Sequence, residues 1–315
     1  MTALTSPARP RQAAPGREPV RRRRTPVAPY LLLVPAIAIL LLALAYPLAW
    51  QVWTSTQKFG LAQQFGRPPQ FVGAGNYTQL FSDAQTWAVV GRSVAFCLVN
   101  AAITVLLGVL VALLMNAVGT VSRLILQVAM LLAWAMPVIA SMTVWIWLFD
   151  WRRGIVNWLL TRLGLDFTNH NWLEQPLSFY FVATVIVVWM SVPFVAFSVY
   201  AGLTQIPDEV MEAAALDGAT PRQRFFAIIL PMIRPVLMIV TLLQVIWDLR
   251  VFAQIKMLQD AGAPIASTDL LGTYIYRLGV GSSDFGMASA LSIFVLLLTV
   301  ALSFFYVLHL LKEDS

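Results

Sequence analysis

The sequence predicts an all-α polytopic membrane protein, and three features of the whole chain indicate this fold class. Of its 315 residues, 59% are hydrophobic and only 11% are charged, whereas a soluble domain carries about 25% charged residues. Its mean hydropathy is +0.75. The apolar residues are gathered into segments of about 20 residues or more, the length at which a helix crosses a bilayer. We therefore expect lipid to cover much of this chain.

The chain begins with a basic segment that is rich in arginine, proline and alanine. We expect residues 1–26 to form a disordered cytoplasmic tail, because basic residues beside a first span mark the cytoplasmic side and attract anionic lipid. The tail and the apolar segment after it also resemble a cleavable signal peptide. That apolar segment is long enough to span a bilayer, which favours an uncleaved first helix. An even number of spans then places both termini in the cytoplasm.

Residues 27–315 are expected to form one membrane domain with six transmembrane helices. Each predicted span is apolar and long enough to cross about 30 Å of hydrocarbon. The spans are expected at residues 30–51, 88–115, 124–149, 177–203, 225–248 and 286–311. Pro137, Pro193, Pro231 and Pro235 fall within these spans or at their ends. Such breaks persist in lipid where neighbouring helices or water satisfy the freed carbonyls, so they indicate a packed bundle that lines a cavity.

Several classes of chemistry have no support in the sequence. The single cysteine, Cys97, lies in an apolar span, and the two histidines, His170 and His309, are far apart. HExxH, GxSxG and GxxxxGK[ST] patterns are absent from the sequence. We therefore expect no metal centre, no catalytic nucleophile and no nucleotide site of the chain's own. Because a third of the basic residues lie in the tail, the net charge of +6 points to anionic lipid rather than to nucleic acid.

Residues 205–224 form a charged insert between the fourth and fifth predicted spans. An acidic first turn that starts at Asp208 and an alanine-rich middle predict a short helix. Gly218 is placed to end that helix in the left-handed conformation. Thr220 then begins a second helix, with a proline at its first position and Gln223 completing a capping box. The alternative is a solvated connecting loop, but two specified caps favour an ordered pair of helices.

The charged insert resembles the EAA loop of binding-protein-dependent ABC importer permeases. The stretch EAAALDGATPRQRFFAIILPMIRP, residues 212–235, has the glutamate, alanines, glycine and downstream Ile-Leu-Pro of that loop. The matching residues are Glu212, Ala213, Ala214, Asp217, Gly218, Ala219, Ile229, Leu230 and Pro231. Residues 71–94, 251–280 and 285–294 resemble further segments of carbohydrate-uptake permeases, the maltose and trehalose transporter relatives, and of the first permease of each pair. This chain departs from the pattern of those permeases at two places: Ala74 replaces the usual leucine, and the stretch DAGAP, residues 260–264 in the last outer loop, is atypical.

The resemblance implies the type I ABC importer permease arrangement and a multi-pass subunit of the bacterial inner (plasma) membrane. It implies import of a di- or oligosaccharide that an extracytoplasmic sugar-binding lipoprotein delivers. The path through the membrane would be formed with a second homologous permease. The EAA loop would be a coupling helix that docks on a separate ATPase, present in two copies. ATP and Mg²⁺ would then bind to that ATPase, and this chain would bind no cofactor.

Polar and aromatic residues inside the fourth and fifth spans are candidate substrate contacts. Gln244 and Asp248 lie four residues apart and share one helix face. A polar side chain inside a membrane usually either has a functional role or pairs with another polar group. Trp189, Ser191 and Phe194 cluster in the fourth span, at positions that resemble the family's substrate-contact stretches. Two alternatives stay open: Asp248 pairs with an arginine at the outer boundary, and Trp189 faces lipid or packs against a neighbour.

Two other functions are weighed against sugar import. A glycerol-3-phosphate permease of the same family would prefer cationic groups in its pocket, and the arginine of the fifth span, Arg234, lies near the cytoplasmic end. A membrane enzyme would need a nucleophile–base pair or a metal set within the bilayer, which two isolated histidines do not supply. The sequence identifies neither the sugar nor the partner chains.

Overall fold

The computed structural model describes residues 28–313. The chain divides into two compact units, Met1–Ala49 and Trp50–Ser315. The predicted tail, residues 1–26, lies outside the described residues. Each unit is described by itself.

The first unit contains one continuous helical segment. Its elements are α1 (Ala28–Leu40), the π-helical turn η1 (Leu41–Ala45) and the start of α2 (Tyr46–Ser55). Side chains from Leu32 to Ala49 are all exposed, and the segment is apolar and long enough to cross a membrane. A helix that is apolar on every side is stable only where lipid or another membrane helix covers it.

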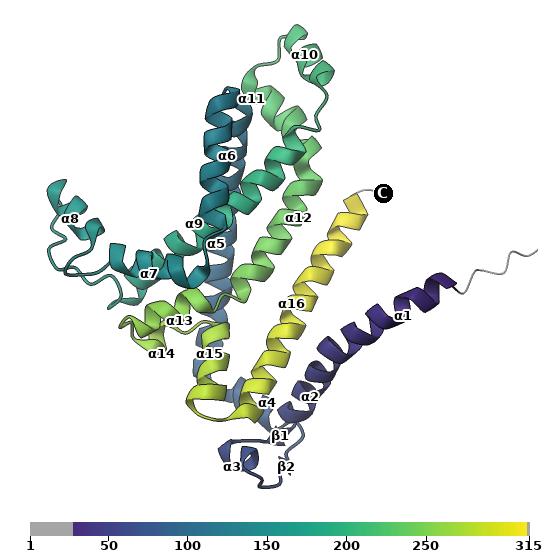
Figure 1. Ribbon diagram of the computed structural model, residues 1–315, viewed down its shortest axis with the longest axis vertical. Helices are drawn as coiled ribbons and strands as arrows, with labels where there is room; N and C mark the ends of the chain where they lie inside the picture. Colours follow the sequence, from purple (N-terminus) through teal and green to yellow (C-terminus); the bar gives the residue numbers. More distant parts are fainter. Residues whose placement is uncertain (1–27, 314–315) are drawn as a thin grey trace, which may run out of the picture. The chain divides into compact units, whose positions relative to one another are not determined.

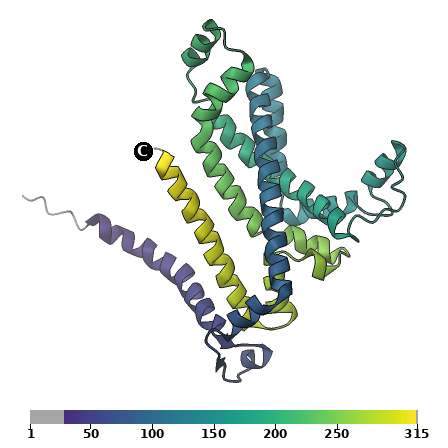
Figure 2. The ribbon, with the colours of Figure 1, turned by 180° about the vertical axis from the view of Figure 1, so that it is seen from behind.

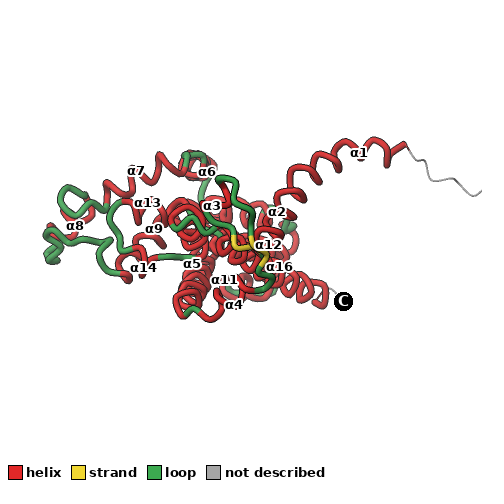
Figure 3. Tube along the Cα trace, turned by 90° about the horizontal axis from the view of Figure 1, so that it is seen from below, coloured by secondary structure: helices red, strands yellow, loops and turns green. Residues whose placement is uncertain are grey.

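The second unit is mostly helical, with loops between the helices, as the red and green parts of the tube in Figure 3 show. Its two strands, β1 (Gln57–Lys58) and β2 (Gln70–Phe71), pair antiparallel. The helices up to the middle of the chain are α3 (Leu61–Gln64), α4 (Gly75–Ser82), α5 (Ala84–Ala117), α6 (Thr120–Trp134), α7 (Val138–Leu148), α8 (Ile155–Arg162) and α9 (Pro176–Leu203). The later elements are α10 (Asp208–Leu216), α11 (Pro221–Arg224), the π-helical turn η2 (Phe225–Ile229), α12 (Leu230–Leu249), α13 (Ala253–Asp260), α14 (Ile265–Thr268), α15 (Leu271–Tyr276), the π-helical turn η3 (Arg277–Gly281) and α16 (Phe285–Glu313).

The centre of the second unit is the packing of α5 against α9, with α12 beside both helices (Figures 1 and 2). Gly108 of α5 lies so close to α9 that an added Cβ would come within 2.5 Å of the Val195 side chain. Small residues at such a crossing let two membrane helices approach closely and gain dispersion contacts. Val195 is fully buried, together with Ala112 of α5 and Ile233 of α12. This crossing carries one buried hydrophobic cluster of the unit, and others lie around α7, α9 and α13 and around α5, α15 and α16.

The predicted segment 124–149 is not one straight helix. α6 ends at Trp134, and α7 leaves at 98° after a break of three residues. Pro137 lies in this break with φ −56° and ψ 135°. Proline has no N–H to donate and keeps the preceding residue out of helical geometry, which explains why the helix stops here. The size of the bend follows from the packing of α7 rather than from the proline alone.

Within residues 28–313, five helical stretches are apolar and long enough to cross a membrane, and the bent α6–α7 pair makes a sixth if it counts as one span. The five are Leu32–Ser55, Ala84–Ala117, Pro176–Leu203, Pro221–Asp260 and Phe285–Leu308. Each stretch overlaps one predicted span, and the bent pair overlaps the remaining one. The predicted all-α, multi-span fold class is confirmed.

Candidate functional site

α10 is the first helix of the charged insert, and its end has the geometry that the sequence predicts. It starts after Pro207 with acidic residues in its first turn. Gly218 has φ +78°, its N–H donates to the Ala215 carbonyl at 3.1 Å, and the Ala219 N–H donates to the Ala214 carbonyl at 3.0 Å. This pair of reverse hydrogen bonds is the Schellman motif, which needs a left-handed residue at the glycine position. The glycine therefore fixes where α10 stops and where the chain turns.

The second helix of the insert is capped as the sequence predicts. The Thr220 N–H donates to the Gln223 Oε1 at 2.8 Å, and the Gln223 N–H donates to the Thr220 Oγ1 at 3.4 Å. α11 then continues through η2 into α12. In η2 the Leu230 N–H donates to the Phe225 carbonyl five residues earlier, just before Pro231, which has no N–H. The wider turn accommodates this loss without breaking the helix.

The helix pair presents both charge and apolar surface to its surroundings. Figure 1 shows α10 at one end of the second unit, beyond α11. Glu212, Ala213 and Asp217 are exposed, whereas Ala214 is buried. Leu216 is 89% exposed, the highest value among the described large hydrophobic side chains. Sequence reasoning did not single out this leucine. The signal for it was present, because an apolar residue two positions before a helix-ending glycine lies on the tip of the turn.

Gln244 and Asp248 form the polar pair that their spacing predicts. The Gln244 Nε2 donates to the Asp248 Oδ1 at 2.8 Å, and the two residues are 0% and 3% exposed. The Gln244 Oε1 and the Asp248 Oδ2 are buried without a hydrogen-bond partner among the described residues. Cys97 of α5 lies beside this pair, since its thiol donates to the Val245 carbonyl at 3.3 Å. The pair thus lies inside the second unit rather than on its surface.

Asp248 does not pair with either of the two arginines considered as its alternative partners. Within residues 28–313, Asp248 has no ion pair with Arg92 or Arg250. Arg92 instead donates to the Ala88 carbonyl at 3.2 Å and to the Ala266 carbonyl at 3.0 Å. A buried carboxyl without a cationic partner carries a large desolvation cost if it is charged. Its free oxygen is therefore available to a proton, to water or to a ligand.

The aromatic candidates in α9 face two different neighbours. Trp189 packs edge-to-face on Trp145 of α7 at 5.5 Å, and it lines an apolar cavity of about 710 Å³ between α5, α6 and α9. Phe194 packs on Trp247 of α12 at 4.9 Å and on Trp134 of α6 at 6.3 Å. The packing alternative considered for Trp189 is therefore observed.

Of the five candidate substrate residues, Trp189 alone lines the 710 Å³ cavity. Gln244 and Asp248 are buried, whereas Trp189, Ser191 and Phe194 are half-buried on α9. A common site would need a change in packing or a further chain that closes over α9 and α12.

A second polar cluster holds together the segment before α16, and sequence reasoning missed it. Asp269 is fully buried, and its two oxygens accept from the Arg277 Nε at 2.7 Å and from the Gln259 Nε2 at 3.1 Å. Burial raises the pKa of the Tyr274 hydroxyl, and this hydroxyl donates to the Asp83 Oδ2 at 3.2 Å. These contacts connect α13, α15 and η3 with one another and with the residue that precedes α5.

Several proteins are similar to this chain in sequence, and solved structures are similar to it in fold. Residues 69–310 match the family model described as "Binding-protein-dependent transport system inner membrane component". The diacetylchitobiose uptake system permease protein DasB of Streptomyces coelicolor is 40% identical over 92% of this chain and 88% of its own length. The trehalose/maltose transport system permease protein MalF of Thermococcus litoralis is 33% identical over 88% of this chain and 91% of its own length. A chain of a bacterial ABC transporter involved in alginate import superposes with a TM-score of 0.78 and 23% identity, over 91% of this chain and 95% of that chain.

These likenesses agree with the multi-span bundle and with the resemblance to importer permeases. The solved transporter supports the fold, and the family model and the two relatives establish descent over most of both chains. The predicted location in the inner membrane is confirmed by the family description. This chain belongs to the inner membrane permeases of binding-protein-dependent ABC transport systems.

Proposed function

We propose that this permease imports a di- or oligosaccharide, which an extracytoplasmic sugar-binding protein delivers and a separate ATPase drives inward. The observation that carries the proposal is the relation to DasB and MalF. Their names specify diacetylchitobiose uptake and trehalose/maltose transport, and both align with this chain over almost its full length. Import of a glycosidically linked substrate is the function that these relatives share.

The proposed coupling element is the helix pair α10–α11. Its exposed carboxylates and the exposed Leu216 supply a polar rim and an apolar tip, the combination typical of a protein interface. Two caps hold the pair in one conformation, so little ordering entropy is lost on docking. ATP and Mg²⁺ would bind to the ATPase, in two copies for the whole transporter, and this permease would bind neither.

The proposed translocation path runs along α9 and α12 and is completed by a second homologous permease. Aromatic rings pack well on the apolar faces of sugar rings. Such rings are supplied by Trp189 and Phe194 on α9 and by Trp247 on α12. The free oxygens of Gln244 and Asp248 supply acceptors for sugar hydroxyls when the wall in front of them opens. Ser191 adds a hydroxyl on the same stretch of α9.

The test is reconstituted transport by the complete complex. The chain is purified with its binding protein, second permease and ATPase and placed in proteoliposomes, and uptake of labelled disaccharides and of glycerol 3-phosphate is measured with and without ATP. We expect ATP-dependent uptake of a disaccharide or of a longer sugar. Uptake that needs no ATPase would refute the importer, and uptake of glycerol 3-phosphate alone would refute the sugar assignment.

The proposed substrate residues are tested in the same vesicles. Phe194→Ala and Asp248→Asn are expected to lower sugar uptake while the sugar affinity of the separate binding protein stays unchanged. Leu297→Ala on α16 is a control, because this side chain is 61% exposed and its helix carries none of the proposed substrate residues. Equal losses in all three variants would indicate a general packing defect rather than a substrate path.

A further inference from the structure

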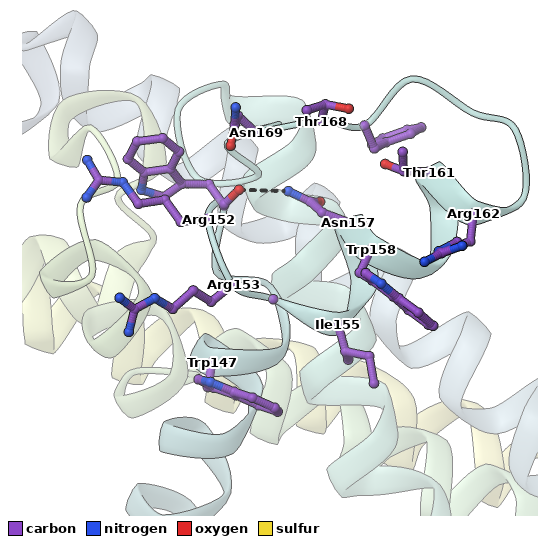
Figure 4. A pocket seen from close by; sticks show the side chains of 13 residues that line it. Trp147, Arg152, Arg153, Ile155, Asn157, Trp158, Thr161, Arg162, Thr168 and Asn169 are labelled. Carbon is purple, nitrogen blue, oxygen red and sulfur yellow. Dashed lines mark hydrogen bonds between the residues drawn. The ribbon is translucent and has the colours of Figure 1, made fainter.

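A cavity of about 560 Å³ lies between the end of α7, helix α8 and the loop after it (Figure 4). It is separate from the helix pair and from the candidate sugar path. Its lining combines guanidinium groups, indole rings and amide or hydroxyl groups. The lining residues are Trp147, Trp151, Arg152, Arg153, Gly154, Ile155, Asn157, Trp158, Thr161, Arg162, Phe167, Thr168 and Asn169.

The loop that carries two of the arginines is held by local hydrogen bonds. The Asp150 Oδ1 accepts from the backbone N–H of Arg152 at 3.0 Å and of Arg153 at 2.7 Å. The Gly154 N–H donates to the Asp150 carbonyl at 2.9 Å. A Cβ at Gly154 would lie 2.4 Å from that carbonyl oxygen and 2.5 Å from the Leu148 carbonyl oxygen. The turn is therefore closed tightly on itself, and both arginine side chains extend away from it.

The floor of the cavity is fixed by a buried asparagine. The Asn157 Nδ2 donates to the carbonyls of Trp151 at 3.3 Å and of His170 at 2.8 Å, and its Oδ1 accepts from the Trp172 Nε1 at 2.6 Å. Figure 4 shows the Asn157 bond that crosses the cavity floor. The Trp172 ring stacks on Phe167 at 5.3 Å. This framework gives the cavity a fixed shape, as a binding site requires.

The charge of the cavity is entirely positive among its lining residues. Arg152, Arg153 and Arg162 are exposed, and none of the lining residues is acidic. Arg152 lies over the Trp151 ring at 4.2 Å and Arg162 over the Trp158 ring at 5.4 Å. Within the described part of the chain, these three arginines have no carboxylate partner within ion-pair distance. Three unpaired guanidinium groups around one cavity favour an anionic occupant.

The cavity lies where a membrane surface is expected. Its lining begins at Trp147, at the end of the predicted third span, residues 124–149, whose two helices α6 and α7 meet at 98°. Figures 1 and 3 show α7 and α8 at the periphery of the second unit. The change from an apolar helix to Trp and Arg residues is typical of the boundary between hydrocarbon and headgroups.

The outer side chains around the cavity have the apolar surface that an acyl chain needs. Trp147, Ile155 and Trp158 line the cavity and are 56%, 47% and 57% exposed. Leu159 and Leu163 beside them are 51% and 70% exposed. In Figure 4, Trp147, Ile155 and Trp158 lie together on one side of Asn157, with Arg153 next to Trp147. Apolar and cationic groups thus lie next to one another around the cavity, as the chains and the phosphate of a phospholipid require.

We propose that this cavity binds an anionic phospholipid, with its headgroup in the positive field of Arg152, Arg153 and Arg162 around the cavity and an acyl chain over Trp147, Ile155 and Trp158. The bound lipid would supply the counter-charge that the described residues lack, and it would fix α7 and α8 at the membrane surface. This site is independent of the sugar that the permease carries.

The experiment is photo-crosslinking in nanodiscs, followed by peptide mapping. Photoactivatable phosphatidylglycerol and phosphatidylcholine with the same acyl chains are compared on the complete complex. We expect phosphatidylglycerol to label the peptide that spans residues 147–169 preferentially. Each arginine near an anionic headgroup contributes enough to change binding roughly fivefold, so Arg153→Gln is expected to reduce labelling about fivefold and Arg153→Lys much less. Arg67→Gln, at an exposed arginine outside the cavity, is the matched control.

Each further outcome decides between sources of the anion. Labelling that 10 mM inorganic phosphate abolishes would indicate a free-anion site without an acyl chain and would overturn the lipid assignment, as would equal labelling by both lipids. Labelling of the peptide that is lost only when the binding protein is added would assign the cavity to that protein. Unchanged labelling in Arg153→Gln and in the Arg152→Gln/Arg153→Gln/Arg162→Gln variant would refute the site outright.

Discussion

Gly218 is the position at which the helix pair can be perturbed with the clearest expected magnitude. Its φ is +78°, and a Cβ built on it would meet no heavy atom within 4 Å. An alanine there would therefore cause no clash within this chain. The cost is the left-handed backbone alone, about 1–2 kcal/mol for a residue with a Cβ, and more for a β-branched one. Such a cost lowers the population of the capped turn by a factor of roughly 5–30.

The assay measures coupling separately from folding. Gly218→Ala and Gly218→Val complexes in proteoliposomes are expected to lose ATP-driven uptake in that order, with at least a fivefold loss for valine. Thermal unfolding of the purified permease should stay unchanged, because the turn lies at the end of the bundle and away from the α5–α9 core. Gly218→Asn is the matched control, since asparagine tolerates the left-handed region better than other residues with a Cβ.

Two results would contradict this reasoning in different ways. If Gly218→Val transports as well as the unaltered chain, the capped turn is not needed for coupling. If Gly218→Asn is as defective as Gly218→Val, the position needs space against a partner rather than a left-handed backbone. The second result would move the explanation from the conformation of this chain to its interface.

Three further changes test other parts of the structure. Gly108→Ala puts a methyl group within 2.5 Å of Val195 and is expected to destabilise the permease by about 1–3 kcal/mol. Adding Val195→Ala should restore part of that stability, and thermal unfolding in detergent measures both effects. Asp269→Asn removes the charge that pairs with a partly exposed arginine and should cost about 1–3 kcal/mol, whereas Asp260→Asn, in an exposed pair, should cost less than about 1 kcal/mol. Leu216→Asp changes a side chain that is 89% exposed, so unfolding should not shift while co-purification of the ATPase falls; retained ATPase would exclude the leucine from the interface.

Features set by neighbouring residues could be predicted from the sequence. The caps at Gly218 and Thr220 depend on φ preference and on a side chain three residues away, so both follow from a short stretch of chain. The Gln244–Asp248 hydrogen bond follows from the helical period. Pro137 marked a helix break, but the 98° angle depends on where α7 finds packing partners and no local signal specifies it.

Contacts between elements could not be predicted in the same way. α5 and α9 are apolar around most of their circumference, so the sequence carries little information on how each helix is rotated about its axis. That rotation decides that Trp189 meets Trp145 while Phe194 meets Trp247. The cavity at Asn157 depends on a tryptophan from the far side of a loop, at 2.6 Å. Hydrogen bonds of this kind join residues that no periodic pattern relates.

The helix pair and the buried polar pair belong to one mechanical element. α11, η2 and α12 form a continuous helix of about 42 Å between Pro221 and Asp248, at 1.5 Å per residue. A displacement of α11 would therefore reach Gln244 and Asp248 along a single stretch of backbone, without a chain of side-chain contacts. η2 and Pro231 lie at the start of this stretch, where missing regular hydrogen bonds make bending easier. Under the proposed coupling, force applied at the helix pair would bend the helix near η2 and shift Trp247 against Phe194, beside the proposed sugar path.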